Sequence, residues 1–442
     1  AKPRPAKPQP LPVIAATGDG GWTESGGQVY KTAIDFTAAQ PTLWVVGRRP
    51  TVGVAEVNWS GAGNRLLAGW RNNGIKLFTR GKDGQWAQRL DFAAVAVKKV
   101  GRIEPPPFSR QRLLVNPANG KLYVAEDMTN FGKSFFKLLE IDPASGVIRP
   151  VLMPFDAEDM AFDSVGLAYL RTDTEVVRYL PDFSDGGKWR EIPWDYGAER
   201  QSIGFISSRG GARSPAVSAL EIPGSRPVWW HSVGMWVNAK GHLAVVCFIR
   251  AKPKERNAKD KFLAKWQPKA YTPRQYPGRA GRYVIHVFDK HGKLIREDAV
   301  PGLPGGDGLG IDAAGDLYVM VAAPRVLDGR PYFNAKSETL MKFRPARAKF
   351  LSSDRAPVPI PEGQKPKRSP DVTRYGIGPT WAEGAEWTYG GVGYGGQGGS
   401  CTCWHSRFQL DMLGRSFVPE VRRFRVAVLD SAGNLILRIG RY

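Results

Sequence analysis

The feature that most constrains the fold is a pair of similar turns in the C-terminal segment 404–442. Asp411 to Gly414 and Asp430 to Asn434 separate short apolar runs, one of which alternates with arginines. An Asp side chain accepts hydrogen bonds from the backbone that follows it, and Gly tolerates positive φ, so both sequences favour tight turns. The segment is therefore predicted to form four short antiparallel strands, which make one meander sheet.

The same unit recurs upstream. The clear copies of its first hairpin are GLGIDAAGDLYVMVA (308–322), GMWVNAKGHLAVVCF (234–248), MAFDSVGLAYLR (160–171) and RLLVNPANGKLYVAED (112–127). Before residue 112 the pattern blurs, with strand-like runs at 42–46, 52–57, 65–68, 75–79 and 85–90. A single meander cannot bury both of its faces. Repeats of roughly 40 to 50 residues therefore predict an all-β fold, a β-propeller of six or seven four-stranded antiparallel blades.

The repeats also predict the domain boundaries. Residues 1–20 are rich in Pro and Lys and are expected to form an N-terminal tether, and residues 21–442 a single propeller domain. The expected blades are 30–100, 108–150, 156–193, 232–300, 305–348 and 404–442, and the expected inserts are 194–231, 250–282 and 349–403.

The repeat pattern resembles that of the NHL-repeat and gluconolactonase-like propellers. Their motif runs apolar-x-apolar-Asp-x-x-Gly-x-apolar-aromatic-Val and is followed by a strand that ends in Asp-x-x-Gly-x-apolar. The best matches to these two parts are GIDAAGDLYVMVA and VAVLDSAGNLILRIG. The resemblance covers most of residues 100–442 and implies the fold. The superfamily includes lactonases, lyases and binding modules, so the resemblance does not select one activity.

The resemblance further implies a divalent cation at the axial top of the ring, held by carboxylates, which suit Ca²⁺ or Mg²⁺. The repeat register places several acidic residues near that end: Glu126, Asp127, Glu158, Asp159, Asp307 and Glu420. An alternative role for each of them is an ion pair with a surrounding arginine.

The chain carries a formal net charge of +22, which predicts attraction to polyanions. The expected partner is an acidic polysaccharide or an acidic protein surface. Nucleic acid fits the charge but conflicts with export, which the Pro/Lys-rich start AKPRPAKPQPLP favours. We therefore expect a secreted or periplasmic protein. No apolar run has the length of a membrane-spanning helix, so solubility is expected as well.

The register of the repeats places the long inserts on one face, the top face, where binding and catalysis are expected. Segment 251–282 contains ten Lys or Arg interleaved with aromatic residues, a composition that suits an anionic chain. The residues predicted to bind substrate on this face are Trp230, Trp266, Tyr271, Trp404 and Arg423.

All three cysteines are expected near the same face. Cys401, Cys403 and His405, with Cys247, form a candidate site for Zn²⁺ or copper, because thiolates and imidazole suit these metals. Two alternatives stay open: a Cys401–Cys403 disulfide or redox pair, and structural thiols. His286 and His291 are predicted to be structural.

Two functions follow. The first is an exported, metal-dependent hydrolase or lyase acting on an anionic or lactone-type substrate, with Zn, Cu or Ca as its ion. In it His231 or His405 moves the proton, and Arg250 and Arg422 neutralise substrate charge. The alternative is a non-catalytic binding or scaffold propeller that docks an acidic partner through its basic rim.

Overall fold

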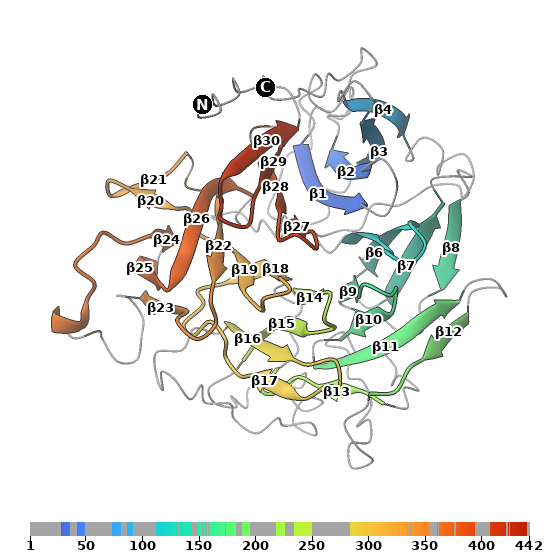
Figure 1. The fold of residues 1–442 in the computed structure, drawn as a ribbon, viewed down its shortest axis with the longest axis horizontal. Coiled ribbons are helices and arrows are strands. Elements are labelled where there is room, and N and C mark those ends of the chain that lie inside the picture. The colour runs from blue at the N-terminus through green and yellow to red at the C-terminus, as the bar shows by residue number, and fades with distance from the viewer. Residues whose placement is uncertain are drawn as a thin grey trace, which may run out of the picture.

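The computed structural model consists of β-strands arranged radially (Figure 1), and it contains one short 3₁₀ turn, Glu362–Gln364, among the described residues. It describes residues 28–35, 42–48, 73–80, 86–91, 112–130, 133–142, 148–152, 154, 157, 159–172, 174–182, 188–194, 218–225, 234–249, 283–333, 335, 337–352, 360, 362–374, 377–393, 407–420, 423 and 425–439. No helix in these ranges has the length and apolar character needed to span a membrane.

Six meander sheets account for most of the strands in the described ranges. The first sheet is β1 (Gln28–Asp35), β2 (Thr42–Arg48), β3 (Asn73–Arg80) and β4 (Trp86–Asp91). The second is β5 (Arg112–Val115), β6 (Leu122–Asn130), β7 (Lys133–Ile141) and β8 (Ile148–Leu152). The third is β9 (Asp159–Phe162), β10 (Ala168–Arg171), β11 (Glu175–Asp182) and β12 (Lys188–Glu191), with β13 (Leu220–Glu221) added against β11.

The other three sheets follow in chain order. The fourth sheet is β14 (Met235–Val237), β15 (Leu243–Phe248), β16 (Tyr283–Phe288) and β17 (Leu294–Arg296). The fifth is β18 (Gly306–Ile311), β19 (Leu317–Val321), β22 (Glu338–Phe343) and β26 (Ala385–Val392). The sixth is β27 (Gln409–Leu410), β28 (Ser416–Glu420), β29 (Arg425–Leu429) and β30 (Leu435–Ile439).

Two small sheets lie outside this series. One is the hairpin of β20 (Val326–Leu327) and β21 (Arg330–Pro331), and the other joins β23 (Lys349–Ser352), β24 (Val372–Arg374) and β25 (Ile377–Glu383). Both belong to connections that enter or leave strands of the fifth sheet.

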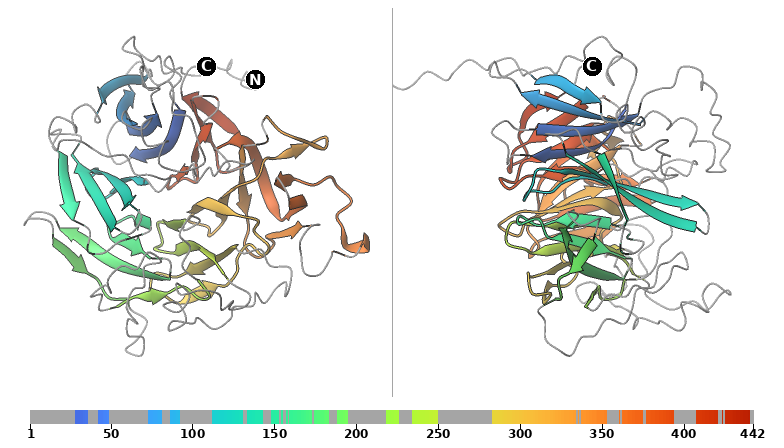
Figure 2. Two further views of the ribbon diagram at one scale, coloured as in Figure 1. Left: turned by 180° about the vertical axis from the view of Figure 1, so that it is seen from behind. Right: turned by 90° about the vertical axis from the view of Figure 1, so that its right-hand side faces the viewer.

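The first strands of the six sheets line the centre of a ring. β1, β5, β9, β14, β18 and β27 contact one another in that order, and β27 also contacts β1. Figures 1 and 2 show the other strands of each sheet lying progressively further from the centre. The all-β prediction is confirmed, and the radial order of the sheets is that of a β-propeller.

The predicted turns form as their sequences require. Asp163, Asn238, Asp312 and Asp411 each accept two backbone N–H groups, from the second and the fourth residue after them, at 2.7–3.0 Å. The Gly three residues after each of them adopts a positive φ between 75° and 89°. These side chains thus cap the backbone of the hairpin between the first and second strands.

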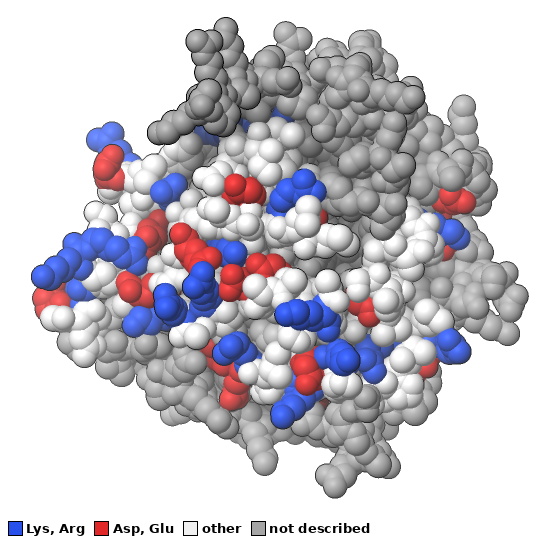
Figure 3. Space-filling model, viewed as in Figure 1, with Lys and Arg blue, Asp and Glu red and all other residues white. Residues whose placement is uncertain are grey.

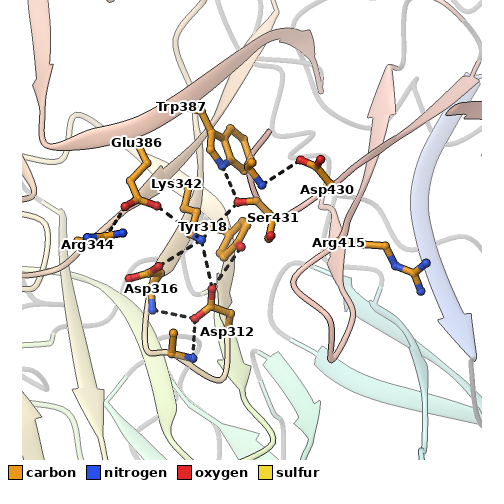
Figure 4. A network of polar contacts seen from close by, with 12 residues as sticks. Asp312, Asp316, Tyr318, Lys342, Arg344, Glu386, Trp387, Arg415, Asp430 and Ser431 are labelled. Carbon is orange, nitrogen blue, oxygen red and sulfur yellow. Dashed lines mark hydrogen bonds and ion pairs between the residues drawn. The ribbon is translucent and has the colours of Figure 1, made fainter. Parts of the chain in front are cut away.

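Polar contacts join neighbouring sheets. Asn238 of the fourth sheet donates to the Asp312 carbonyl of the fifth at 2.8 Å. Lys342 on β22 pairs with Asp312 (3.5 Å) and Asp316 (3.2 Å) and donates to the Ser431 carbonyl of the sixth sheet (Figure 4). Trp387 also donates to the Ser431 carbonyl, at 3.0 Å. The fifth and sixth sheets are therefore joined by hydrogen bonds as well as by apolar packing.

Three sequence predictions differ from the structure. The fourth strand of the fifth sheet is β26, which comes from the segment 349–403 predicted to be an insert. Insert 194–231 contributes β13 to the third sheet. The first sheet begins with β1 at Gln28–Asp35, outside every strand-like run noted before residue 112. The runs 52–57 and 65–68 lie outside the described residues. For β26 and β13 the pairing partner is separated by a long segment, so the local sequence pattern does not reveal it.

A buried carboxyl lies where the fourth sheet meets segment 218–225. Asp298 is 2% exposed, has φ 48°, and neither of its carboxyl oxygens has a hydrogen-bond partner. Its backbone N–H lies 3.3 Å from His286 Nδ1, and His286 Nε2 lies 3.0 Å from the Pro223 carbonyl oxygen. Burial, and then the neighbouring Glu297, raise the pKa of Asp298 to about 7.

We predict that Asp298→Asn weakens the pH dependence of stability. The unfolded carboxyl ionises near pH 4 and the folded one near pH 7, so the folded state binds more protons between these values and stability falls as pH rises. Burial lowers the pKa of His286 to about 4, so this histidine gives the opposite slope below pH 6.5. The difference in stability between wild type and Asp298→Asn therefore isolates the contribution of Asp298, because His286 is present in both.

Urea unfolding at several pH values measures this effect. Between pH 4 and pH 8 the stability of Asp298→Asn relative to wild type should rise by roughly 3 kcal/mol. Asp430→Asn is the control. The pKa of Asp430 is lowered, chiefly by its hydrogen bond with the Asn434 side chain, so loss of this carboxylate changes the pH dependence of stability only at acid pH. Parallel curves for wild type and Asp298→Asn would contradict the assignment.

Candidate functional site

The candidate site lies at the upper end of the ring, defined as the end where the first strand of a sheet begins and the second strand ends. Asp159 begins β9, Arg407 precedes β27, and Glu420 ends β28. All three side chains are at most 4% exposed. Charged groups from opposite sides of the ring are thus buried at this end.

Asp159 and Arg407 form an ion pair across the axis of the ring. Arg407 Nη1 lies 2.8 Å from Asp159 Oδ2, and the other carboxylate oxygen accepts the Met160 N–H at 2.8 Å. β9 and β27 are separated by two first strands in either direction around the ring. The pair therefore ties opposite sheets together and neutralises the carboxylate.

Glu420 is surrounded by guanidinium groups. Its carboxylate pairs with Arg425, with Arg438 at 3.2 Å and with Arg423 at 3.5 Å. It also accepts the Tyr389 hydroxyl at 2.9 Å. Burial, and then Glu420, raise the pKa of Tyr389 to about 12, so this hydroxyl keeps its proton. One carboxylate facing three guanidiniums leaves the cluster with an excess of positive charge.

Arg423 also contacts an aromatic pair from the connection between β19 and β22. Its guanidinium carbon lies 4.0 Å from the centre of the Phe333 ring and 5.9 Å from that of Tyr332. Tyr332 and Phe333 pack on Gly390 and Gly391 of β26, where a Cβ would come within 3.3 Å of Tyr332. Phe333 has φ 65° and stays 45% exposed.

Two of the predicted site residues lie in the described part of the chain. Arg423 lies at the upper end, beside Glu420 and Phe333, and its role in binding substrate stays a prediction. Cys247 is fully buried in β15 among apolar residues of the third and fourth sheets, and burial raises the pKa of its thiol to about 12. A protonated thiol in these surroundings is a core residue. The bonds of His286 described above agree with its predicted structural role.

The remaining predicted residues lie outside the described residues. They are Cys401, Cys403, His405, His231, Arg250, Arg422, Trp230, Trp266, Tyr271 and Trp404. The metal, catalytic and aromatic assignments that rest on them stay predictions.

The described carboxylates at this end do not fit a cation site. Asp159 and Glu420, which the register placed there, are already bonded to guanidinium groups. No group of three or more His, Cys, Asp or Glu residues in the described ranges lies close enough to hold a metal ion. For Asp159 and Glu420 the alternative of an ion pair with arginine is the one observed.

Several contributors were not predicted. Arg407 and Arg438 come from charged positions next to or within strands, and Tyr389 comes from the segment predicted to be an insert. Phe333 lies in a connection with no repeat pattern. Arg425 alternates with apolar residues in β29, which gave its strand position but not its partner.

The excess of positive charge is not gathered on the face shown in Figure 3. Among the described residues there, Lys and Arg are interspersed with Asp and Glu.

No protein-family model matches the chain, and no curated protein sequence matches it. Similar solved structures include virginiamycin B lyase from Staphylococcus aureus, 9% identical, with a TM-score of 0.35 over 94% of this chain and 84% of that one. A putative gluconolactonase is 11% identical, with a TM-score of 0.33 over 74% and 77%. The calcium-binding protein regucalcin from Agrobacterium tumefaciens is 13% identical, with a TM-score of 0.32 over 76% and 75%.

These neighbours agree with the gluconolactonase-like resemblance of the repeats. With TM-scores below 0.5, they carry nothing about the site or the activity of this chain.

We predict that Arg407→Met destabilises the protein by about 3–5 kcal/mol, because it leaves the Asp159 carboxylate buried without its charge partner. The double variant Asp159→Asn, Arg407→Met should lose less than the sum of the two single variants. Urea unfolding measures both. Lys365→Met is the control, because Lys365 pairs with Glu362, which is 85% exposed, and its loss should cost under about 1 kcal/mol. Equal losses of stability for Arg407→Met and Lys365→Met would show that the ion pair between Asp159 and Arg407 contributes no more to stability than an exposed pair.

Proposed function

We propose that this chain is a six-bladed β-propeller that binds an anionic ligand at the upper end of its sixth sheet. The observation that supports the proposal most directly is the Glu420 cluster, in which three guanidiniums surround one carboxylate. Anions are attracted to such an excess of positive charge, and guanidinium groups bind carboxylates in a defined geometry.

Access and rigidity support the same proposal. The side chains of Arg423, Arg425 and Arg438 are 20%, 20% and 29% exposed, while Glu420 is fully buried. The buried carboxylate thus holds the three arginine side chains in place, and part of each side chain remains open to solvent. A ligand would meet positive groups that are already ordered, which lowers the entropy cost of binding.

Six blades fit the ring of six first strands, and the connections from β15 to β16 and from β19 to β22 leave from the upper end. We therefore place the ligand on the face predicted from the repeat register.

This is the binding alternative of the two predicted functions. No contact in the described ranges favours the hydrolase or lyase alternative. Its acid–base residues, and its metal residues other than Cys247, lie outside those ranges. That alternative and the prediction of export stay predictions.

We predict that the protein binds polyanions with an affinity that falls steeply as salt rises, and that Arg438→Gln lowers both affinity and salt dependence. Gln keeps a hydrogen-bonding group beside Glu420 and Tyr389 but removes one charge. We expect a three- to tenfold loss, equivalent to about 1 kcal/mol. Titration with polygalacturonate, polyglutamate and DNA at matched salt concentrations measures it.

Arg344→Gln is the matched control, because Arg344 pairs with Glu386 just beyond the far end of β22. This substitution also removes one positive charge, but at a position outside the Glu420 cluster. The variant should therefore bind polyanions as wild type does. Wild-type protein that binds none of the three polyanions at low salt would overturn the proposed function.

A further inference from the structure

We propose that Arg423 and Phe333 form a subsite for a carboxylate carried on a sugar ring, specifically a uronic acid unit of an acidic polysaccharide. This inference rests on the proposed function and names its ligand class. It depends on one juxtaposition: the Arg423 guanidinium lies over the ring of Phe333, a residue that is still 45% exposed.

The guanidinium supplies the anion-binding half of the subsite. The guanidinium carbon of Arg423 lies over the Phe333 ring, 4.0 Å from the ring centre. A guanidinium carries five N–H donors in its own plane, and a contact with an aromatic ring leaves donors for a carboxylate. Arg423 Nη1 is 3.5 Å from Glu420 Oε1, longer than a hydrogen bond, and Arg425 and Arg438 already pair with that carboxylate. Arg423 is therefore the guanidinium of the cluster with most capacity for a second carboxylate.

Phe333 supplies the ring-binding half. A large aromatic residue with 45% of its surface exposed and a left-handed backbone is held there by its surroundings. Those surroundings are Gly390 and Gly391, which let the Tyr332–Phe333 pair approach β26 closely. An ordered, half-exposed ring beside a cation offers an apolar surface at low entropy cost.

Both halves together select the ligand class. A linear polyanion such as polyglutamate carries carboxylates on flexible stems and presents no flat surface to Phe333. In a uronic acid the carboxylate is attached directly to a pyranose ring, whose C–H face is weakly polar and packs on an aromatic ring. Only a ligand of the second kind uses the guanidinium and the aromatic ring at the same time.

The test uses the full chain and a defined oligogalacturonate, with its methyl ester and polyglutamate as comparison ligands. The methyl ester keeps the rings and removes the charge. Wild type should bind the free acid at least about tenfold more tightly than the ester, because the ester loses the charge-assisted contact. Arg423→Gln should remove most of this difference, and Arg423→Lys should restore only part of it, since Lys lacks the planar fork.

Phe333→Leu separates ring recognition from charge. It should weaken oligogalacturonate binding about three- to tenfold, corresponding to loss of an aromatic contact, and leave polyglutamate binding unchanged. Phe333→Tyr keeps the flat ring and should bind as wild type. The melting temperature of each variant shows whether it is folded, and Phe333→Tyr gives a reference if Phe333→Leu is unstable.

The two proposals fail in different ways. If wild type binds no polyanion, the proposed function fails. If wild type binds oligogalacturonate but Arg423→Gln and Phe333→Leu bind it equally well, the subsite is overturned and the function stands. If Phe333→Leu weakens polyglutamate as much as oligogalacturonate, the site recognises charge alone, and the uronic acid assignment is wrong.

Discussion

The ion pair between Asp159 and Arg407 links parts of the chain that are almost 250 residues apart. It can form only when the ring is closed, since each partner comes from the start of a different first strand on opposite sides of the axis. Two charges are removed from water, and their attraction offsets that cost only if the geometry is good and the other lone pairs are bonded. The Met160 N–H supplies one such bond. The upper end is thus stabilised by an interaction that no single sheet contains.

The same rule explains the Glu420 cluster. A buried carboxylate requires partners, and the partners here come from the fifth sheet (Tyr389) and from three positions in or beside the sixth. Because guanidiniums outnumber carboxylates, the structural requirement also produces a local positive charge. The stability of the junction and its attraction for anions therefore have one physical origin.

The sequence predicted what depends on local pattern. The sixth sheet has its four strands within segment 404–442 and its turns where they were predicted, because Asp411 and Asp430 with their glycines fix both turns. It did not predict β26, since the choice of the fourth strand depends on which segment pairs with β22. It placed Asp159 and Glu420 at the correct end but left open their partners, because Arg407 and Arg438 are fixed by ring closure.

The long separation in sequence between β22 and its partner β26 has a consequence for how the chain folds during synthesis. β22 ends at Phe343, and its partner β26 begins at Ala385, so the outer side of β22 has no sheet partner while the intervening residues are being synthesised. An unpaired strand edge is a template for association with other chains. The fifth sheet is therefore the stage of biogenesis at which aggregation would compete most directly with folding, and at which a chaperone would have the most to protect.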